Sequence, residues 1–330
     1  MPTFHKLVAV RTSDTFREAL EVQEVELAPP SQGQLQVAVR YVGVNAADYL
    51  MAAGRYLAPT PPPYDMGAEA VGVVSAVGPG VTDFHEGDAV LAVGVPGYRD
   101  VLTMSAAQAI PVSQATPEVL TLGVSGLTAS IALHEVGQMS RGETVLVTAA
   151  AGGTGSFAAQ LAKQAGNHVI GTCSSSDKVD FLRSLGVDRP INYKAEDLAA
   201  VLKAEYRKGV DLIFEGVGGT TFDRCVDALA VRGRLLIIGA ISEYESGPQV
   251  VTGPRILYKL LYKSASLRAF WLMHYFRHTR DHMARLLAML REGTIRAATD
   301  PTPFIGLSRA IDAIDYMYQG KNVGKVVVQI

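Results

Sequence analysis

The chain has 330 residues, of which 48% are hydrophobic and 19% charged, a composition that permits a large core and excludes a disordered or fibrous protein. Thirty basic and 32 acidic side chains give a formal net charge of -2, which provides no general electrostatic attraction to nucleic acid or to an anionic membrane. We therefore expect a two-domain protein that binds neither, and any phosphate ligand must be held locally.

Cysteine content and hydropathy bear on the cellular compartment. Cys173 and Cys225 are too few for a disulfide framework or a four-thiolate zinc site, so we expect reduced thiols. The first residues contain no apolar segment of signal-peptide length, and no uncharged apolar run approaches the ~18 residues of a membrane span. These features predict a cytoplasmic location.

The first third of the chain is predicted to be rich in β-strands. Residues 34–42 alternate between apolar and polar side chains, and residues 69–77 and 89–93 are rich in valine and alanine. Glycine and proline crowd the connections, as in residues 54–63. Short strands with such connections predict a compact, barrel-like module.

From about Ser140 the pattern changes to apolar strands alternating with amphipathic helices, which is typical of a parallel sheet covered by helices. The predicted strands are 144–149, 168–173, 189–193, 210–215 and 233–238, and the predicted helices are 155–165, 177–185, 196–203 and 220–229. In such folds the ligand lies at the carboxyl ends of the strands.

The last part of the chain predicts helices at 279–291 and 307–318 and a final strand at 325–329. If that strand returns to the first module, the sheet-and-helix domain is an insertion.

The most informative motif is Thr144-Val-Leu-Val-Thr-Ala-Ala-Ala-Gly-Gly-Thr-Gly155, a strand that runs into a glycine-rich turn and a helix. Gly152 lets the backbone approach a pyrophosphate, Gly155 lets the helix pack on the sheet, and the first helical amides face the negative charge. Ala150 stands where the dinucleotide fingerprint usually has its first glycine. The motif predicts a dinucleotide site.

The end of the second strand of this domain favours NADPH over NADH. No acidic residue stands at the strand tip to bind a ribose 2′-hydroxyl, whereas Ser174 and Lys178 suit a 2′-phosphate. Asp177 is expected to cap the following helix. The alternative for Lys178 is a solvated lysine in the first helical turn.

The glycine-rich loop, the Ser174-x-x-x-Lys178 pattern, Ile191-Asn-Tyr193 and Gly320-Lys-Asn-Val-Gly-Lys325 resemble the medium-chain dehydrogenase/reductases, in their zinc-free quinone oxidoreductase branch. The resemblance runs along essentially the whole chain. It implies an α/β fold, with a GroES-like catalytic domain at 1–123 and 304–330 and an inserted, doubly wound Rossmann domain at 124–303. It also implies a homodimer or homotetramer.

The resemblance implies specific contacts with NADPH. Thr128 is matched to the nicotinamide ribose region and Asn322 to the dinucleotide. The remaining matched positions are Gly152, Gly153 and Thr154 for the pyrophosphate, Ser174, Lys178 and Tyr193 for the 2′-phosphate, and Gly239, Ala240 and Ile241 for the nicotinamide side.

The pattern of metal ligands in the zinc-dependent branch is not retained. Asn45 and Ala68 stand at the places of its cysteine and histidine, and no cluster of four cysteines follows. None of the seven histidines is expected to lie at ligand spacing with a partner. We therefore expect no metal.

A metal-free site needs a neutral donor for the oxygen on which negative charge develops. Tyr244 is the first choice, because it follows the fifth strand of the second domain, and Tyr56 and Asn45 are further candidates. In the alternative interpretations Tyr244 covers a loop, Tyr56 packs on prolines and Asn45 caps a turn. Asp48 is expected to order the Asn45 loop or to cap a helix.

These features predict NADPH-dependent, zinc-independent reduction of a small hydrophobic conjugated carbonyl compound, namely a quinone, an enone or a 2-alkenal. One alternative is a 2-enoyl thioester reductase, for which Lys259, Lys263 and Arg268 could bind the coenzyme phosphates. A second alternative is a non-catalytic NADPH-binding protein.

Overall fold

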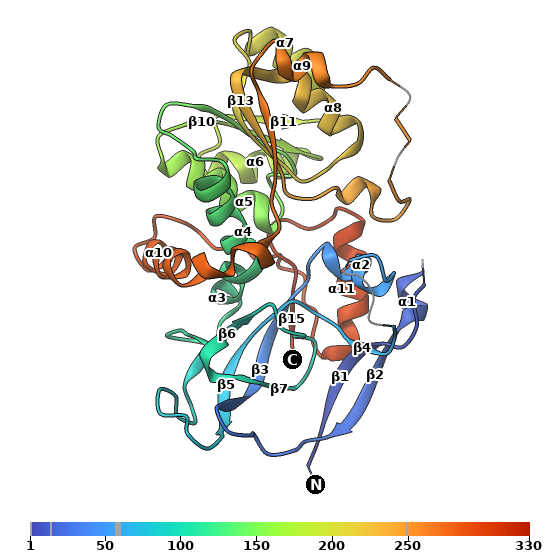
Figure 1. Ribbon diagram of the computed structural model, residues 1–330, viewed down its shortest axis with the longest axis vertical. Helices are drawn as coiled ribbons and strands as arrows, with labels where there is room; N and C mark the ends of the chain where they lie inside the picture. Colours follow the sequence, from blue (N-terminus) through green and yellow to red (C-terminus); the bar gives the residue numbers. More distant parts are fainter. Residues whose placement is uncertain (1, 14, 57–60, 249, 252) are drawn as a thin grey trace. The chain divides into compact units, whose positions relative to one another are not determined.

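The computed structural model describes residues 2–13, 15–56, 61–248, 250–251 and 253–330 (Figure 1). Its contacts divide the chain into two compact units, one of residues Met1–Val124 and Ala297–Ile330 and one of residues Ser125–Arg296. The predicted second boundary lies after residue 303. The contacts place it after Arg296, since Thr299 already forms a β-bridge with Lys325 in the first unit.

The first unit contains two antiparallel sheets. The larger has the order β15-β3-β5-β6-β8, with β7 also paired to β3, and the smaller has the order β2-β1-β4. The strands are β1 (Thr3–Ala9), β2 (Leu20–Glu26), β3 (Gln34–Gly43), β4 (Tyr64–Asp65), β5 (Glu69–Val77), β6 (Ala89–Val93), β7 (Val101–Ser105), β8 (Ile110–Pro111) and β15 (Val327–Gln329). The predicted return of the last strand is confirmed, because β15 pairs with β3.

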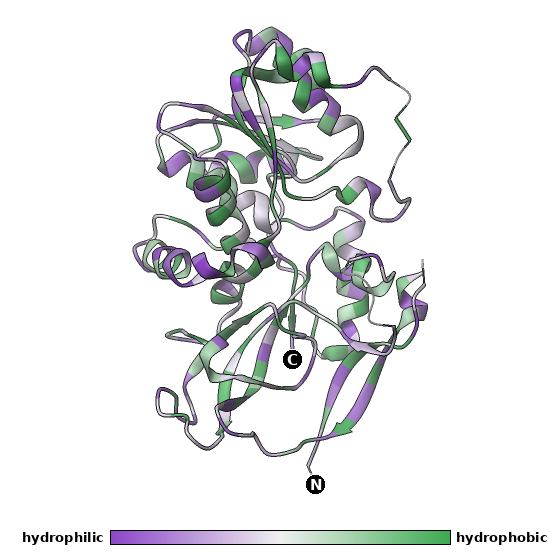
Figure 2. Ribbon diagram, viewed as in Figure 1, coloured by the Kyte–Doolittle hydropathy of each residue, from purple (hydrophilic) through white to green (hydrophobic). Residues whose placement is uncertain are grey.

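Helices of the first unit are short: α1 (Phe16–Ala19), α2 (Ala47–Ala52), α3 (Pro117–Thr121) and α11 (Ala310–Tyr318), with 3-10 turns η1 (Ala106–Gln108) and η6 (Leu307–Arg309). The hydrophobic residues of β3 pack into the core, where Leu35 and Val37 are at most 1% exposed. By contrast, most residues of β2 are hydrophilic and solvent-accessible (Figure 2). Such one-sided burial is typical of antiparallel sheets.

The second unit contains a six-stranded parallel sheet with the order β11-β10-β9-β12-β13-β14. Its strands are β9 (Thr144–Val147), β10 (His168–Cys173), β11 (Arg189–Asn192), β12 (Val210–Glu215), β13 (Leu229–Ile237) and β14 (Ser266–Ala269). The order reverses between β9 and β12, which marks the switch point at which doubly wound sheets bind ligands. The predicted Rossmann architecture is confirmed.

From Gly153 onward, the helices of the second unit are α5 (Gly153–Gln164), α6 (Ser176–Ser184), α7 (Leu198–Glu205), α8 (Gly219–Ala228), α9 (Leu257–Leu261) and α10 (Thr279–Arg291), with 3-10 turns η4 (Ile241–Glu243) and η5 (Leu272–His278). Apolar residues of five strands and of α7 and α8 form a core cluster, among them Leu146, Ile170, Ile213 and Leu235, each 0% exposed. Burial of one such side chain stabilises the fold by about 1.5–3 kcal/mol.

The sequence analysis missed a helical segment at residues 117–136. It consists of α3 (Pro117–Thr121), η2 (Leu122–Gly126), α4 (Leu127–Ile131) and η3 (Ala132–Val136), and two of these four are π-helical. Among the described residues it is the one helix long and apolar enough to span a membrane, which corrects the expectation that no run approaches that length. Since 83% of its most apolar window is buried within the protein, it is a core helix.

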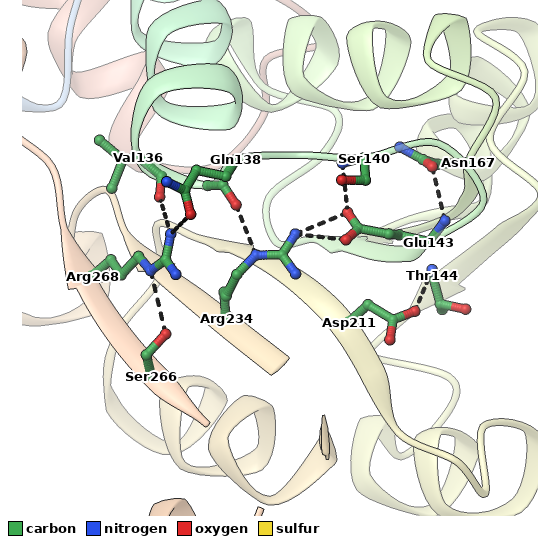
Figure 3. Close-up of polar contacts among 11 residues, drawn as sticks. Val136, Gln138, Ser140, Glu143, Thr144, Asn167, Asp211, Arg234, Ser266 and Arg268 are labelled. Atoms are coloured by element: carbon green, nitrogen blue, oxygen red, sulfur yellow. Dashed lines mark hydrogen bonds and ion pairs between the residues drawn. The ribbon is translucent and has the colours of Figure 1, made fainter. Parts of the chain in front are cut away.

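Two arginines of the sheet hold the carboxyl end of this helix (Figure 3). Arg268 of β14 donates to the Val136 carbonyl at 2.6 Å, and Arg234 of β13 donates to the Gly137 carbonyl at 2.7 Å. Arg234 also forms a largely buried ion pair with Glu143 at 2.8 Å. These side chains satisfy carbonyls that have no intrahelical donor.

Candidate functional site

The glycine-rich loop joins β9 to α5, with Gly152 at the N-cap. A Cβ atom on Gly155 would lie 2.4 Å from the Ala149 carbonyl oxygen, so glycine is needed there, as predicted. A Cβ on Gly152 would meet that oxygen at 3.4 Å, an ordinary contact, so the fold itself does not require this glycine. Glycine at position 152 therefore fits a ligand that approaches from outside the loop.

The turn is shaped by Ala149, whose φ of 46° lies in the left-handed region that costs a non-glycine residue about 1–2 kcal/mol. Its N–H donates to Thr172 Oγ1 at 3.1 Å, and the Ala150 N–H donates to the Thr172 carbonyl at 2.9 Å. The turn therefore bends at Ala149. Ala150, at the usual place of the first glycine, is completely buried.

Gly153 and Thr154 form the start of the 12-residue α5, whose first turn contains no acidic residue. The first N–H groups of an α-helix have no intrahelical acceptor, and the helix dipole adds partial positive charge there. These features suit an anionic ligand such as a pyrophosphate.

Ser174, Lys178 and Tyr193 come from neighbouring strand ends. Cys173 of β10 pairs with Asn192 of β11, and the Tyr193 N–H donates to the Cys173 carbonyl at 3.0 Å. Ser174 and Tyr193 are therefore the residues directly after two paired strand ends. Lys178 lies in the first turn of α6. Burial raises the pKa of the Cys173 thiol, and the contact with the Ser175 carbonyl and the charge of Lys178 oppose this rise.

Asp177 does not cap α6 as predicted. The N-cap is Ser175, whose Oγ accepts a hydrogen bond from the Lys178 N–H at 3.4 Å. Asp177 is instead an exposed residue of the first helical turn. Ser174 and Ser175 both precede the helix, so the sequence offered more than one possible cap.

Loops after β12 and β13 meet at the other side of the switch point. The Ile241 N–H donates to the Gly216 carbonyl at 3.3 Å, and the Ser242 N–H donates to the Val217 carbonyl at 3.0 Å. The carboxylate of Glu215, completely buried, accepts hydrogen bonds from the N–H groups of Val217 and Gly218 at 2.8 and 3.1 Å. Burial raises the pKa of Glu215, and these bonds oppose the rise.

Glu215 therefore orders the loop at the end of β12, a role that the sequence analysis missed. The available signal was a single acidic residue between an apolar strand and the run Gly216-Val-Gly-Gly219.

Tyr244 lies on the predicted nicotinamide loop. Its hydroxyl oxygen accepts a hydrogen bond from the Ala240 N–H at 3.2 Å, and a Cβ on Gly239 would lie 2.8 Å from that oxygen. The structure thus brings Tyr244 together with Gly239, Ala240 and Ile241.

Thr128 is 8% exposed and belongs to α4 of the second unit. Tyr56 and Asn322 belong to the first unit. Tyr56 is half-buried in a bend that precedes the undescribed residues 57–60, and the Asn322 side chain donates to the Gly324 carbonyl at 2.8 Å. The roles of these three residues toward a ligand stay predictions.

Asn45 belongs to a buried polar cluster of the first unit. Lys325 Nζ donates to Asn45 Oδ1 at 2.6 Å and lies 2.6 Å from Glu69 Oε1, with 3% and 0% of the lysine and glutamate side chains exposed. Asn45 Nδ2 donates to Glu69 Oε1 and to the Gly43 carbonyl, both at 3.1 Å. Both amide protons are therefore used within the cluster, and the role of Asn45 as a donor to the substrate oxygen stays a prediction.

Asp48 orders the Asn45 loop, as expected. Its Oδ2 accepts hydrogen bonds from the Asn45 N–H at 2.8 Å and from the Tyr98 hydroxyl at 2.7 Å. Among the described atoms its buried Oδ1 has no hydrogen-bond partner. Burial raises the pKa of Asp48 to about 6.

One expectation about the histidines is wrong. His278 and His282 stand one helical turn apart and both lie close to Glu135, at 3.7 and 3.2 Å. The sequence analysis missed this group because Glu135 is more than 140 residues away along the chain.

Comparisons with known proteins agree with this architecture. Residues 31–179 match the family "Alcohol dehydrogenase GroES-like domain", and residues 153–290 match "Zinc-binding dehydrogenase". The chain is 46% identical to mouse prostaglandin reductase-3, over 99% of this chain and 90% of the relative. It is 43% identical to a probable quinone oxidoreductase of Leishmania amazonensis, over 99% and 98% of the two chains. The Escherichia coli quinone oxidoreductase complexed with NADPH superposes with a TM-score of 0.85 at 26% identity, over 99% and 100% of the two chains.

Proposed function

Because the chain belongs to the medium-chain dehydrogenase/reductases, in the group that contains the quinone oxidoreductases, we propose that it is an NADPH-dependent oxidoreductase that reduces a conjugated carbonyl compound. The observation that carries this proposal is that Ser174 and Tyr193 follow two adjacent strands and Lys178 lies in the first turn of the next helix, without a carboxylate at the tip of β10.

The described residues fit NADPH in three places. Gly152, Gly153 and Thr154 would hold the pyrophosphate at the start of α5. Ser174, Lys178 and Tyr193 would hold the 2′-phosphate, since an ammonium and two hydroxyls suit a dianion. The loop Gly239–Ile241 would border the nicotinamide at the carboxyl end of β13. The bound cofactor supplies the hydride, and the protein supplies orientation and charge stabilisation.

We propose that Tyr244 stabilises the negative charge that develops on the substrate oxygen. Its hydroxyl is positioned on the loop after β13 by the bond from the Ala240 N–H. A neutral phenol can donate to an enolate oxygen without a metal, and such donors contribute about 100-fold or more to catalysis. Asn45 stays a further candidate, and its amide belongs to the polar cluster around Glu69.

We also propose that the reaction does not depend on zinc. Asn45 and Glu69 contact one another in the first unit, and the cation beside them is the Lys325 ammonium. The buried carboxylate is thereby neutralised by a residue of the chain itself. The amide and ammonium present there are poor zinc ligands compared with thiolate and imidazole.

The proposed substrates are quinones, enones and 2-alkenals, and a panel assay tests them. NADPH oxidation is followed by its absorbance with a substituted quinone, a ring enone, a 2-alkenal and crotonyl thioester, in a buffer with a strong chelator. We expect turnover of at least one of the first three. Turnover of the thioester alone would favour the thioester reductase alternative, and no turnover with any compound would favour a binding role.

The structure weighs against the thioester alternative. The three basic residues considered for the coenzyme phosphates are already engaged within the second unit. Lys259 pairs with the Asp227 carboxylate at 2.6 Å, Lys263 donates to the Asp227 carbonyl at 2.7 Å, and Arg268 donates to the Val136 carbonyl. Each bond would have to be broken or shared to bind a phosphate.

We further propose a homodimer or homotetramer in the cytoplasm. β14 lies at an edge of the parallel sheet, and α9 with the residue after it exposes four large side chains, 62–79% accessible: Leu257, Tyr258, Leu261 and Tyr262. Both cysteines are free thiols, which suits a reducing compartment. Light scattering tests the assembly, and a mass of 35.2 kDa in solution would contradict it.

A further inference from the structure

Three potential metal ligands converge in the second unit, and no residue among them was assigned to the cofactor or to the substrate. Glu135 lies in the π-helical turn η3, His278 is the last residue of η5 and His282 lies in the first turns of α10. Figure 1 shows α10 beside α4, the helix that leads into η3, and the two elements are in contact. The group thus joins two segments that are far apart in sequence.

The distances between the ligand atoms are close to those of a metal site. Glu135 Oε1 lies 3.2 Å from His282 Nε2, and Glu135 Oε2 lies 3.7 Å from His278 Nδ1. One ligand atom from each residue can be chosen so that all lie within 4.8 Å of one another. Tetrahedral zinc with bonds of about 2.0–2.1 Å separates its ligand atoms by roughly 3.3 Å. Reductions of up to about 1.5 Å in these separations would therefore close the site around an ion.

The local structure aims these side chains at one point. Residues 278 and 282 are four apart, so their side chains lie on the same face of the helix start. His282 is only 4% exposed, and its Nδ1 forms a hydrogen bond of 2.7 Å with the hydroxyl of Ser130, also buried. That bond occupies one ring nitrogen and directs Nε2 toward Glu135, as in many metal sites where an outer partner orients the histidine.

Ligand type and access also suit a cation. His278 Nε2 accepts a hydrogen bond from Arg277 Nε at 2.9 Å, so binding of an ion through His278 Nδ1 requires that this bond is released and that the ring proton moves to Nε2. A carboxylate and two imidazoles are a common ligand set for zinc. The Glu135 and His278 side chains are 37% and 25% exposed, which leaves a path for an ion and room for water as a fourth ligand.

We propose that Glu135, His278 and His282 bind a Zn²⁺ ion, with solvent as the fourth ligand. The ion ties the start of α10 to the end of the core helix. This site is separate from the zinc-independent chemistry proposed above, because none of its ligands belongs to the cofactor or tyrosine groups.

Zinc titration of the full chain tests this proposal. Chelator-treated protein is titrated with ZnCl₂ by calorimetry, and Zn²⁺ is added to matched samples in thermal denaturation. We expect one ion per chain, a rise in melting temperature, and visible absorption of tetrahedral geometry when Co²⁺ replaces Zn²⁺. Glu135→Gln and His278→Gln should each weaken binding at least about tenfold and abolish the thermal shift. His85→Gln, a change at an 82% exposed side chain of the first unit, is the matched control and should bind as the parent does.

Binding by Glu135→Gln and His278→Gln with the parent affinity would overturn the proposal, as would the absence of binding to the parent chain. Because both variants change partly exposed side chains, they test the site without disturbing buried His282. Quinone reduction in the presence of chelator is measured on the same samples, so that loss of the zinc site and loss of the proposed catalysis are distinguished.

Discussion

Lys325 Nζ lies 2.6 Å from Glu69 Oε1, and the two side chains are 3% and 0% exposed. Glu69 begins β5 and Lys325 lies just before β15, so this ion pair joins the beginning and the end of the chain within the first unit. Glu69 Oε2 also accepts a hydrogen bond from the Val124 N–H at 2.6 Å. A buried carboxylate held in this way depends strongly on its partner cation.

Replacement of Lys325 by methionine is expected to destabilise the protein by about 3–5 kcal/mol, because Glu69 would be left as an uncompensated buried charge. The double variant Glu69→Gln with Lys325→Met should recover most of this loss, since neither residue is then charged. Urea denaturation of the two variants and the parent measures both effects. A loss below about 1 kcal/mol in the single variant would show that the pair is not coupled as described.

Asp48 should make stability depend on pH. Its folded pKa of about 6 lies above the ordinary 3.8, so the folded state binds more protons than the unfolded state between these values. Its stabilising contribution is complete below pH 3.8 and is lost as the pH rises through about 6. The total loss is about 3 kcal/mol.

The variant Asp48→Asn removes this titration, because an amide does not ionise. Its carbonyl oxygen can still accept the hydrogen bonds from the Asn45 N–H and the Tyr98 hydroxyl. We expect its free energy of unfolding, relative to that of the parent, to increase between pH 4 and pH 7 by about 2–3 kcal/mol. Parallel pH profiles for the two proteins would mean that Asp48 does not titrate in this range.

Two glycines of the phosphate loop should respond differently to alanine. Gly155→Ala places a Cβ 2.4 Å from the Ala149 carbonyl, so we expect a loss of about 1–3 kcal/mol in stability as well as weaker NADPH binding. Gly152→Ala meets its nearest atom at 3.4 Å and should change stability by less than about 0.5 kcal/mol.

If the pyrophosphate approaches Gly152, Gly152→Ala should bind NADPH at least about tenfold more weakly than the parent chain, although its stability is nearly unchanged. Thermal denaturation and fluorescence titration with NADPH separate the two effects. Unchanged affinity in Gly152→Ala would place the pyrophosphate elsewhere.

Regular periodicity made much of the fold predictable. Strands such as β5, β10 and β12 have the predicted bounds because their apolar runs end at turns or at polar residues. The helix at 117–136 was missed because Gly123 and Gly126 interrupt its pattern, and tertiary burial compensates for their low helix propensity. β14 was missed because Ser266 and Arg268 leave its four residues without an apolar run.

For the site, too, residues of a local sequence motif were predictable and contacts between distant segments were not. Gly155 and Ser174 belong to a local motif, and local spacing predicts their place at strand ends. Contacts such as Lys325 with Glu69, or His282 with Glu135, join distant segments whose approach depends on the whole fold. A single sequence contains no signal for such pairs.

Tyr244→Phe tests the proposed donor to the substrate oxygen. Loss of the hydroxyl should lower kcat for a quinone or enone about 100-fold while the KM for NADPH changes little. Tyr262→Phe removes a hydroxyl from a side chain that is 79% exposed on the same unit, and it serves as the control. Steady-state kinetics with both variants gives the comparison, and a kcat within about twofold of the parent would assign Tyr244 to loop packing only.

Calorimetric titration with NADPH and NADH tests the central claim most directly. We expect the parent chain to bind NADPH at least about tenfold more tightly than NADH, a difference of about 1.4 kcal/mol. Lys178→Glu should remove this preference by weakening NADPH alone, whereas Lys203→Glu, the same charge change on an exposed residue of α7, should leave it intact. Equal binding of NADPH and NADH by the parent chain, or equal weakening of both in Lys178→Glu, would contradict a 2′-phosphate site formed by Ser174, Lys178 and Tyr193.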